Sequence, residues 1–175
     1  MSMNQEAGNS AWRITVGTMP KTLEELRVFP GADLTDYRYT AALAVAVLAT
    51  YPRDKESCFA MLDYLKGPQP LSTYEKQFID DRLRGKEYLP FSFFEGATPQ
   101  NAYAPTTPLS IIVTETPHSR NQIGEGYIQV FLQSGGADAP RPVKLRNKPS
   151  TGQWFLWEQM LLSDIRIPEA ADPWA

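Results

Sequence analysis

The sequence has little of the material from which disulfide frameworks, metal centres and membrane spans are built. It contains one cysteine, Cys58, and one histidine, His118. A single cysteine can form neither an intramolecular disulfide nor a cysteine-based metal cluster, and such usage is typical of a reducing compartment. The longest apolar run covers only residues 41–49, whereas a membrane-spanning helix needs about 20 residues.

Other signals of location and partner are also missing. The first residues lack the layout of a secretory signal, in which basic residues precede an apolar stretch. The formal net charge is −3 at pH 7, so no global excess of positive charge favours nucleic acid or an anionic membrane. We therefore expect a cytoplasmic protein with no membrane partner, for which a nucleic-acid partner is disfavoured.

Motifs that commonly carry chemistry are absent as well. The sequence has no phosphate-binding G-x-x-x-x-G-K-[ST], no G-x-G-x-x-G and no nucleophile elbow G-x-S-x-G. The residues 134–136, Ser-Gly-Gly, could bind an anion through backbone amides, but a hairpin loop explains the same glycines. We predict no catalytic residue, no metal and no cofactor, and we leave enzymatic activity open while leaning against it.

The order of the patterns along the chain predicts the fold class. Residues 12–16 alternate like a short strand, and the first 10 residues are polar. Expected helix starts are Thr22, Asp33 or Thr35, Asp54 and Ser72. Expected strands cover residues 109–115, 127–133, 143–146 and 153–157, with 164–168 as a further candidate.

Helical segments followed by strands indicate an α+β fold. We predict an N-terminal three-helix block that packs on one face of a C-terminal antiparallel sheet of four or five strands. The length of 175 residues suits one domain. We therefore expect a flexible N-terminus over residues 1–10 and a single α+β domain over residues 11–175.

Side chains alternate across a strand, so each expected strand contributes to two faces of the sheet. One face is wholly apolar and should pack on the helices: Leu109, Ile111, Val113, Ile128, Val130, Leu132, Val143, Leu145, Trp154 and Leu156. The other mixes aromatic, amide and cationic side chains: Ile112, Thr114, Tyr127, Gln129, Phe131, Gln133, Lys144, Arg146, Phe155 and Trp157.

The mixed face predicts a non-catalytic protein-interaction or binding module, because exposed aromatic patches mark interaction surfaces. The candidate binding residues are Tyr127, Gln129, Phe131, Arg141, Lys144, Arg146, Phe155 and Trp157. The partner would be an unidentified protein or a second copy of the chain. Cover by loops or by the C-terminal segment of the same chain is the alternative that needs no partner.

Two other hypotheses remain open. A small-molecule or enzymatic pocket between the sheet and the helices could use the polar groups of Glu95, Tyr103, Glu115 and His118. A platform for anions or single-stranded nucleic acid could use rings beside cations, although the acidic composition weighs against it.

Three long segments resemble a known family: TVGTMPKTLEEL, YPRDKESCFAMLDYLKGPQPLSTYEKQFIDDRL and SGGADAPRPVKLRNKPSTGQWFLWEQMLLSDIRIP. The sequence is similar over residues 12–174 to an uncharacterised family of bacterial proteins with a domain of unknown function, associated chiefly with Gram-positive anaerobes. The resemblance implies a bacterial, cytoplasmic protein and brings no activity or catalytic residue. At the level of fold alone, helices followed by a curved sheet also resemble the cone-shaped NTF2-like fold.

Overall fold

The computed structural model describes residues 2–6 and 9–175, with side chains described from residue 10 onward. The strands are β1 (Ser2–Glu6), β2 (Asn9–Gly17), β3 (Leu109–Glu115), β4 (Tyr127–Leu132), β5 (Arg141–Lys148) and β6 (Gln153–Gln159). The helices are α1 (Leu23–Leu26), α2 (Tyr37–Leu48), α3 (Lys55–Lys66), α4 (Thr73–Leu83) and α5 (Tyr88–Phe91), with 3-10 turns η1 (Pro99–Asn101), η2 (Ile123–Glu125) and η3 (Glu169–Ala171).

The predicted α+β class is confirmed, but the predicted arrangement is wrong. Two strands, β1 and β2, precede the helices, and the helices lie in the chain between the neighbouring strands β2 and β3. The sheet has six antiparallel strands in sequence order rather than four or five. The alternating apolar residues of β2 explain the difference: pairing with β3 sets Ile14 beside Ile111 and buries both completely.

The predicted flexible segment over residues 1–10 falls partly on residues 1, 7 and 8, which lie outside the described residues. The backbone of Ser2–Glu6 pairs with β2 and makes β1 the first strand of the sheet. The flexibility and the single-domain boundary at residue 11 stay predictions.

Helix α2 lies at the centre of the molecule. Every residue from Thr40 to Leu48 is buried, as expected for a helix that is apolar on all sides. The one polar side chain in this stretch, Thr40, donates its hydroxyl to the backbone carbonyl of Trp154 at 2.8 Å. The helix begins later than predicted: Asp36 is its N-cap and accepts from the amide of Arg38, whereas Asp33 accepts from the amide of Thr35 in a local turn.

The helices around α2 begin and end where the sequence marks them. Asp54 caps α3 by accepting from the amide of Ser57, and Gly67 ends that helix with a φ of 62°. Ser72 and Glu75 form a reciprocal capping box at the start of α4. The turn over residues 67–71 lies between these helix ends and forms one wall of the candidate site.

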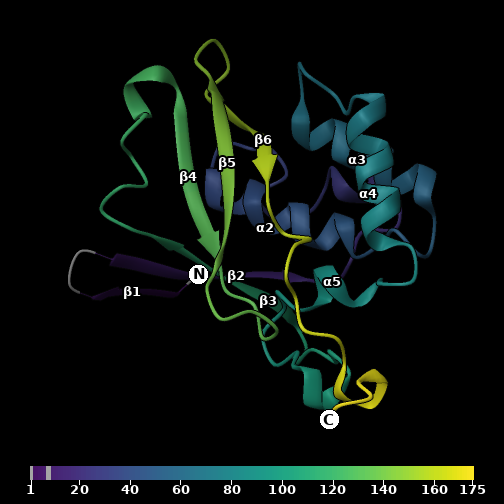
Figure 1. The fold of residues 1–175 in the computed structure, drawn as a ribbon. Helices are drawn as coiled ribbons and strands as arrows, with labels where there is room; N and C mark the ends of the chain where they lie inside the picture. Colours follow the sequence, from purple (N-terminus) through teal and green to yellow (C-terminus); the bar gives the residue numbers. More distant parts are fainter. Residues whose placement is uncertain (1, 7–8) are drawn as a thin grey trace.

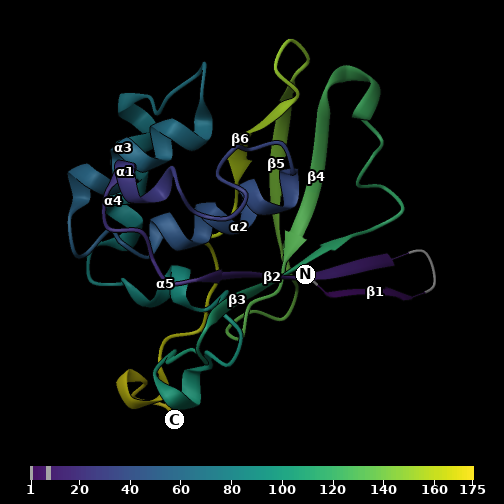
Figure 2. The ribbon, with the colours of Figure 1, turned by 180° about the vertical axis from the view of Figure 1, so that it is seen from behind.

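The helices lie on one side of the sheet, and the hairpin of β4 and β5 rises beside them (Figures 1 and 2). Strands β3 and β4 pair through only two residue pairs, whereas β4 and β5 pair through six. The two halves of the sheet therefore diverge, and β2 runs nearly across the direction of β4 in both views. Residues 164–168 form no strand, so that further candidate was wrong.

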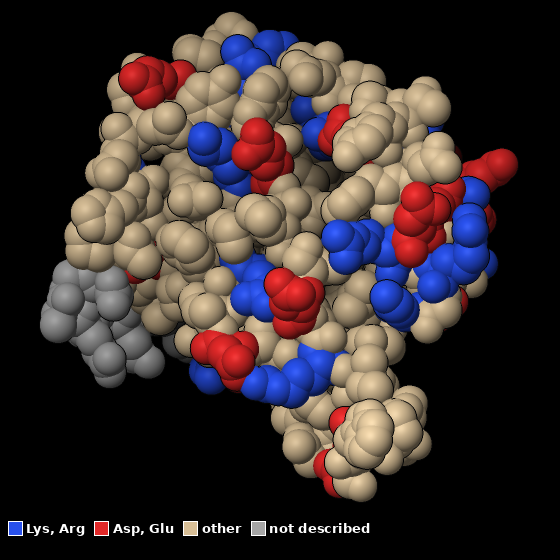
Figure 3. Space-filling model, in the orientation of Figure 1, with Lys and Arg blue, Asp and Glu red and all other residues tan. Residues whose placement is uncertain are grey.

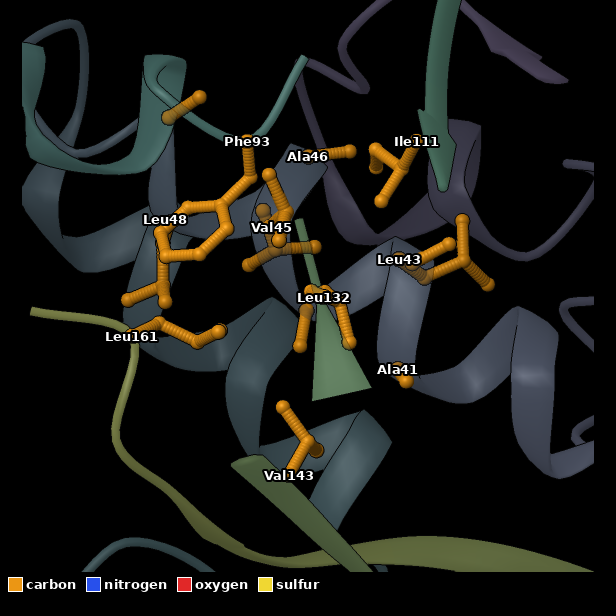
Figure 4. Close-up of a cluster of buried hydrophobic side chains, with 14 of the residues drawn as sticks. Ala41, Leu43, Val45, Ala46, Leu48, Phe93, Ile111, Leu132, Val143 and Leu161 are labelled. Carbon is orange, nitrogen blue, oxygen red and sulfur yellow. The ribbon is translucent and has the colours of Figure 1, made fainter. Parts of the chain in front are cut away.

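The alternation of side chains across the sheet is as predicted. Val130 and Leu145 are completely buried, whereas Lys144 is partly exposed and Arg146 is exposed. In the core, Leu132 and Val143 of the sheet approach α2 at Leu43 and Val45 (Figure 4). The apolar face packs on the helices, whereas the mixed face carries partly or fully exposed side chains such as Lys144 and Arg146.

Candidate functional site

Four predicted residues meet on the mixed face, and we call them the aromatic–cation cluster: Tyr127, Lys144, Arg146 and Trp157. The rings of Tyr127 and Trp157 meet edge to face, with centroids 5.7 Å apart. The guanidinium carbon of Arg146 lies 4.6 Å from the centre of the Trp157 ring and 5.5 Å from that of Tyr127. The Lys144 ammonium lies 5.3 Å from the Tyr127 centroid. All four contacts are within the range of cation–π and aromatic pairing.

Strand register brings the cluster together. Arg146 lies between Tyr127 of β4 and Phe155 of β6 in one cross-strand row, and directly opposed residues share a face. The register shifts between Lys144 and Leu145, so that Leu145 opposes Leu156 while Lys144 opposes Glu158. Trp157 is therefore the extra residue of a β-bulge, a feature that redirects a side chain.

The cations of this face make no ion pair in the part of the chain whose side chains are described, although Glu158 is the cross-strand neighbour of Lys144. Lys144, Arg146 and Lys148 make no ion pair there, and the Arg146 guanidinium makes no hydrogen bond. By contrast, Arg13, Arg38 and Arg120 each pair with a carboxylate. Basic and acidic side chains are interspersed on the face seen in Figure 3.

Two surface hollows have a cation of the cluster in their lining. One has a volume of about 340 Å³ and is lined by polar groups, among them His118, Gln129 and Lys144. The other has a volume of about 330 Å³ and is lined by both cations and rings, among them Arg146 and Trp157. Their sizes are in the range of small ligand sites, and each contains residues of the cluster.

The second hollow lies beside the turn between α3 and α4. The ring of Phe155 lies so close to Gly67 that a Cβ on this glycine would come within 2.3 Å of it. Lys66, next to that glycine, is buried and pairs with Glu75 at 3.0 Å. The turn therefore packs against Phe155 at the edge of β6, and both Phe155 and Trp157 stay partly exposed.

The structure separates Arg141 from the cluster. Its guanidinium donates to three backbone carbonyls, those of Ala139, Ser163 and Asp164, at 2.9 to 3.0 Å. These bonds tie the start of β5 to the chain that follows β6. Gln129 lines the polar hollow, and Phe131 opposes Pro142 further along the same face.

The loop at Ser134 is a packed turn and does not present free amides to an anion. The Gly135 amide donates to the Ser92 carbonyl at 2.8 Å, and the Gly136 amide donates to the Ser134 hydroxyl at 3.2 Å. A Cβ on Gly136 would meet the Tyr103 hydroxyl at 2.1 Å. Close approach of the backbone explains these glycines.

The four polar residues of the alternative pocket lie in different surroundings. Glu95 accepts from Arg13 and Ser110, and the Arg13 hydrogen bond holds the pKa of this carboxyl below its usual value. Tyr103 donates to the Arg166 carbonyl and stacks on Tyr88.

Glu115 is buried and accepts from Tyr37 at 2.5 Å and from Arg120 at 3.2 Å. Burial, and after it the bond to Glu115, raises the pKa of Tyr37. His118 lies in an exposed loop beside Asn121. The described residues include no group of three metal-ligating side chains suited to a metal ion.

Sequence reasoning missed Lys66 and Lys148 as lining residues of the second hollow. Lys148 follows Lys144 and Arg146 at the same period of two, so extending the expected strand by two residues would have found it. Lys66 has no such signal, because it comes from a helix more than seventy residues earlier in the chain.

The fold and the cluster define an α+β protein with a helix-covered apolar sheet face and a partly open aromatic and cationic one. Residues 18–169 match the family model of the domain of unknown function DUF6935, and the chain belongs to this family. Neither the curated proteins nor the solved structures contain a significant match to the chain. Within the described residues no helix is both long and apolar enough to span a bilayer.

Proposed function

We propose that this protein is a non-catalytic binding module that engages a protein partner through the mixed face of its sheet. The observation that carries the proposal is the aromatic–cation cluster, in which two partly exposed rings hold a cation that has no acidic partner among the described side chains. Tyrosine, tryptophan and arginine dominate binding energy at protein interfaces. The remaining predicted residues, Gln129, Phe131 and Phe155, would extend the contact area.

The cluster suits binding better than support of the fold. The apolar side chains that fix the sheet point to the opposite face, where Val130 and Leu145 are completely buried. Arg146 is exposed, yet its two ring contacts restrict its side chain. A cation restrained before binding loses less side-chain entropy when a partner arrives.

The alternative of a small-molecule or enzymatic pocket in an NTF2-like fold has less support. It needs convergent polar groups, whereas Glu95, Glu115 and His118 have separate partners. The resemblance to bacterial proteins from Gram-positive anaerobes, together with one buried free cysteine, supports a bacterial and cytoplasmic setting as part of the proposal.

The test is affinity capture with the wild type and the double variant Arg146→Ala/Trp157→Ala. A matched control is Arg27→Ala, which removes a cation from one ring, that of Tyr64, at 5.9 Å on the helical side. We expect the double variant to lose the partner retained by the wild type and the control, with a melting temperature lowered by only a few degrees.

Two outcomes would overturn the proposal. A collapse of the melting temperature in the double variant would show that the cluster belongs to the core. Equal capture by all three proteins would show that binding uses another surface. Light scattering on the same samples tests for self-association. If the wild type is a dimer and the double variant is a monomer, the partner is a second copy of the chain.

A further inference from the structure

Arg38 and Arg146 occupy nearly the same aromatic setting at two distant places in the chain. The guanidinium carbon of Arg38 lies 4.8 Å from the ring centre of Trp12 and 5.6 Å from that of Tyr37. The corresponding distances for Arg146 are 4.6 Å and 5.5 Å, again to one tryptophan and one tyrosine. Each arginine is thus held by the same pair of ring types at the same spacing.

The two arginines differ in what their donors contact. Arg38 makes a bidentate contact with Asp36, with Nε at 2.9 Å from one carboxylate oxygen and Nη2 at 2.8 Å from the other. Arg146 has no hydrogen bond or ion pair with the described side chains, and it is exposed. A planar guanidinium matches a carboxylate bidentately. Arg38 has such a carboxylate partner in Asp36, whereas Arg146 has none among the described side chains.

The hollow next to Arg146 has room for a carboxylate and for an apolar group attached to it. It measures about 330 Å³ and is lined by Phe155, Trp157, Pro68 and Pro149 as well as by Lys148. No aspartate or glutamate lines it, and the charge of the third cation, Lys66, is matched by Glu75. An anionic group would therefore meet two cations with no repelling carboxylate, and an apolar group attached to it would meet rings and prolines.

We propose that Arg146 binds the carboxylate of an aspartate or glutamate side chain of the partner protein, and that an apolar residue next to this acid fills the hollow beside Phe155 and Trp157. The inference rests on the proposed function, because it names the chemistry that the mixed face recognises. Lys148 supplies a second, more flexible positive charge at the rim. Asp36 plays the corresponding role for Arg38 within the chain.

The test is an NMR titration of the labelled protein with two blocked tetrapeptides, Ala-Glu-Phe-Ala and Ala-Gln-Phe-Ala. The signals to follow are the side-chain Nε–H of Arg146 and the indole N–H of Trp157. We expect the glutamate peptide to shift both signals with saturation at millimolar concentration, and the glutamine peptide to bind about 10-fold more weakly or not at all, since a hydrogen bond to a charged group is stronger than a neutral one.

Variants locate the contact. Arg146→Gln should weaken the glutamate peptide about 10-fold or more, and Arg146→Lys should weaken it too, because lysine keeps the charge but loses the planar fork. Arg27→Gln is the matched control and should leave the affinity unchanged. Gly67 and Phe155 amide signals report whether the fold around the hollow is intact in each variant.

Three results would overturn the inference: equal affinity for the two peptides, unchanged affinity of Arg146→Gln, or phenyl phosphate binding more tightly than the glutamate peptide. Absence of any peptide binding would also overturn it. The proposed function is tested separately, because a partner still captured through Arg146 and Trp157 after such a failure would leave the binding surface in place and remove only its acidic ligand.

Discussion

The Arg146 guanidinium carbon lies 4.6 Å from the centre of the Trp157 ring, on the face where strand alternation places both side chains. The β-bulge in β6 makes Trp157 the extra residue opposite Lys144 and Leu145. This places the indole against a cation that also contacts Tyr127 at 5.5 Å. The centre of the candidate site thus lies beside an irregularity in the edge strand.

We predict a small, measurable coupling between Arg146 and Trp157. In a double-mutant cycle with Arg146→Ala and Trp157→Ala, the coupling in the free energy of unfolding should be about 0.5–1 kcal/mol, the value for exposed cation–π pairs. Urea unfolding of the four proteins provides the measurement. The pair Arg27 and Trp157, which share no contact, should show additive effects, and a coupling of similar size there would invalidate the interpretation.

The two faces of β5 should respond very differently to truncation. Leu145 is completely buried among the core residues, so Leu145→Ala should cost about 2–5 kcal/mol of unfolding free energy. Lys144 is its neighbour on the other face, where it makes no ion pair with the described side chains and one cation–π contact with Tyr127, so Lys144→Ala should cost about 1 kcal/mol or less. Similar losses for the two variants would contradict the assignment of the faces.

This alternation could be predicted from sequence because its signal is local. A period of two needs only neighbouring residues, and it sorted Val130 from Gln129 and Leu145 from Lys144 correctly. Helix α3 is a second success, since Asp54 and Gly67 mark both of its ends by chemistry within one turn.

The failures have a common physical origin in contacts between distant segments. β1 is polar and shows no alternation, and its place in the sheet comes from backbone pairing with β2, which no side-chain pattern announces. The bulge at Trp157 depends on how β6 meets β5. The hollow beside Arg146 requires the turn after Lys66 to wrap β6, a relation that no local signal in either segment encodes.

Gly67 should be the glycine least tolerant of a side chain at the site. Its φ is 62°, and an added Cβ would approach the Phe155 ring to 2.3 Å. Gly67→Ala should therefore combine backbone strain of about 1 kcal/mol with displacement of the ring. Gly85→Ala is the matched control, because Gly85 has a φ of 74° but nothing within 4 Å of the added atom.

We expect Gly67→Ala to lower the unfolding free energy clearly more than Gly85→Ala, as measured in urea. It should also shift the NMR signals of Arg146 and Trp157, because Phe155 forms a wall of the same hollow. Equal losses in the two variants would mean that the turn after α3 does not press on Phe155.

Tyr103 should make the protein sensitive to alkali. Burial, and after it the neighbouring Tyr88, raises the pKa of Tyr103 to about 12 from an ordinary value of 10.0. The unfolded chain then releases this proton at lower pH than the folded one. The stabilising contribution is therefore complete below pH 10 and is lost as the pH rises from 10 to about 12.

The variant Tyr103→Phe separates this titration from the hydrogen bond that the hydroxyl donates to the Arg166 carbonyl. At neutral pH the variant should be less stable by about 1 kcal/mol, because that bond is lost. Between pH 10 and 12 its stability should fall less steeply than that of the wild type, by about one proton in the linkage slope. Urea unfolding at a series of pH values gives both quantities. Parallel losses of stability in Tyr103→Phe and the wild type over this window would contradict the raised pKa of Tyr103 in the folded protein. They would mean that the Tyr103 hydroxyl is not buried against the C-terminal segment.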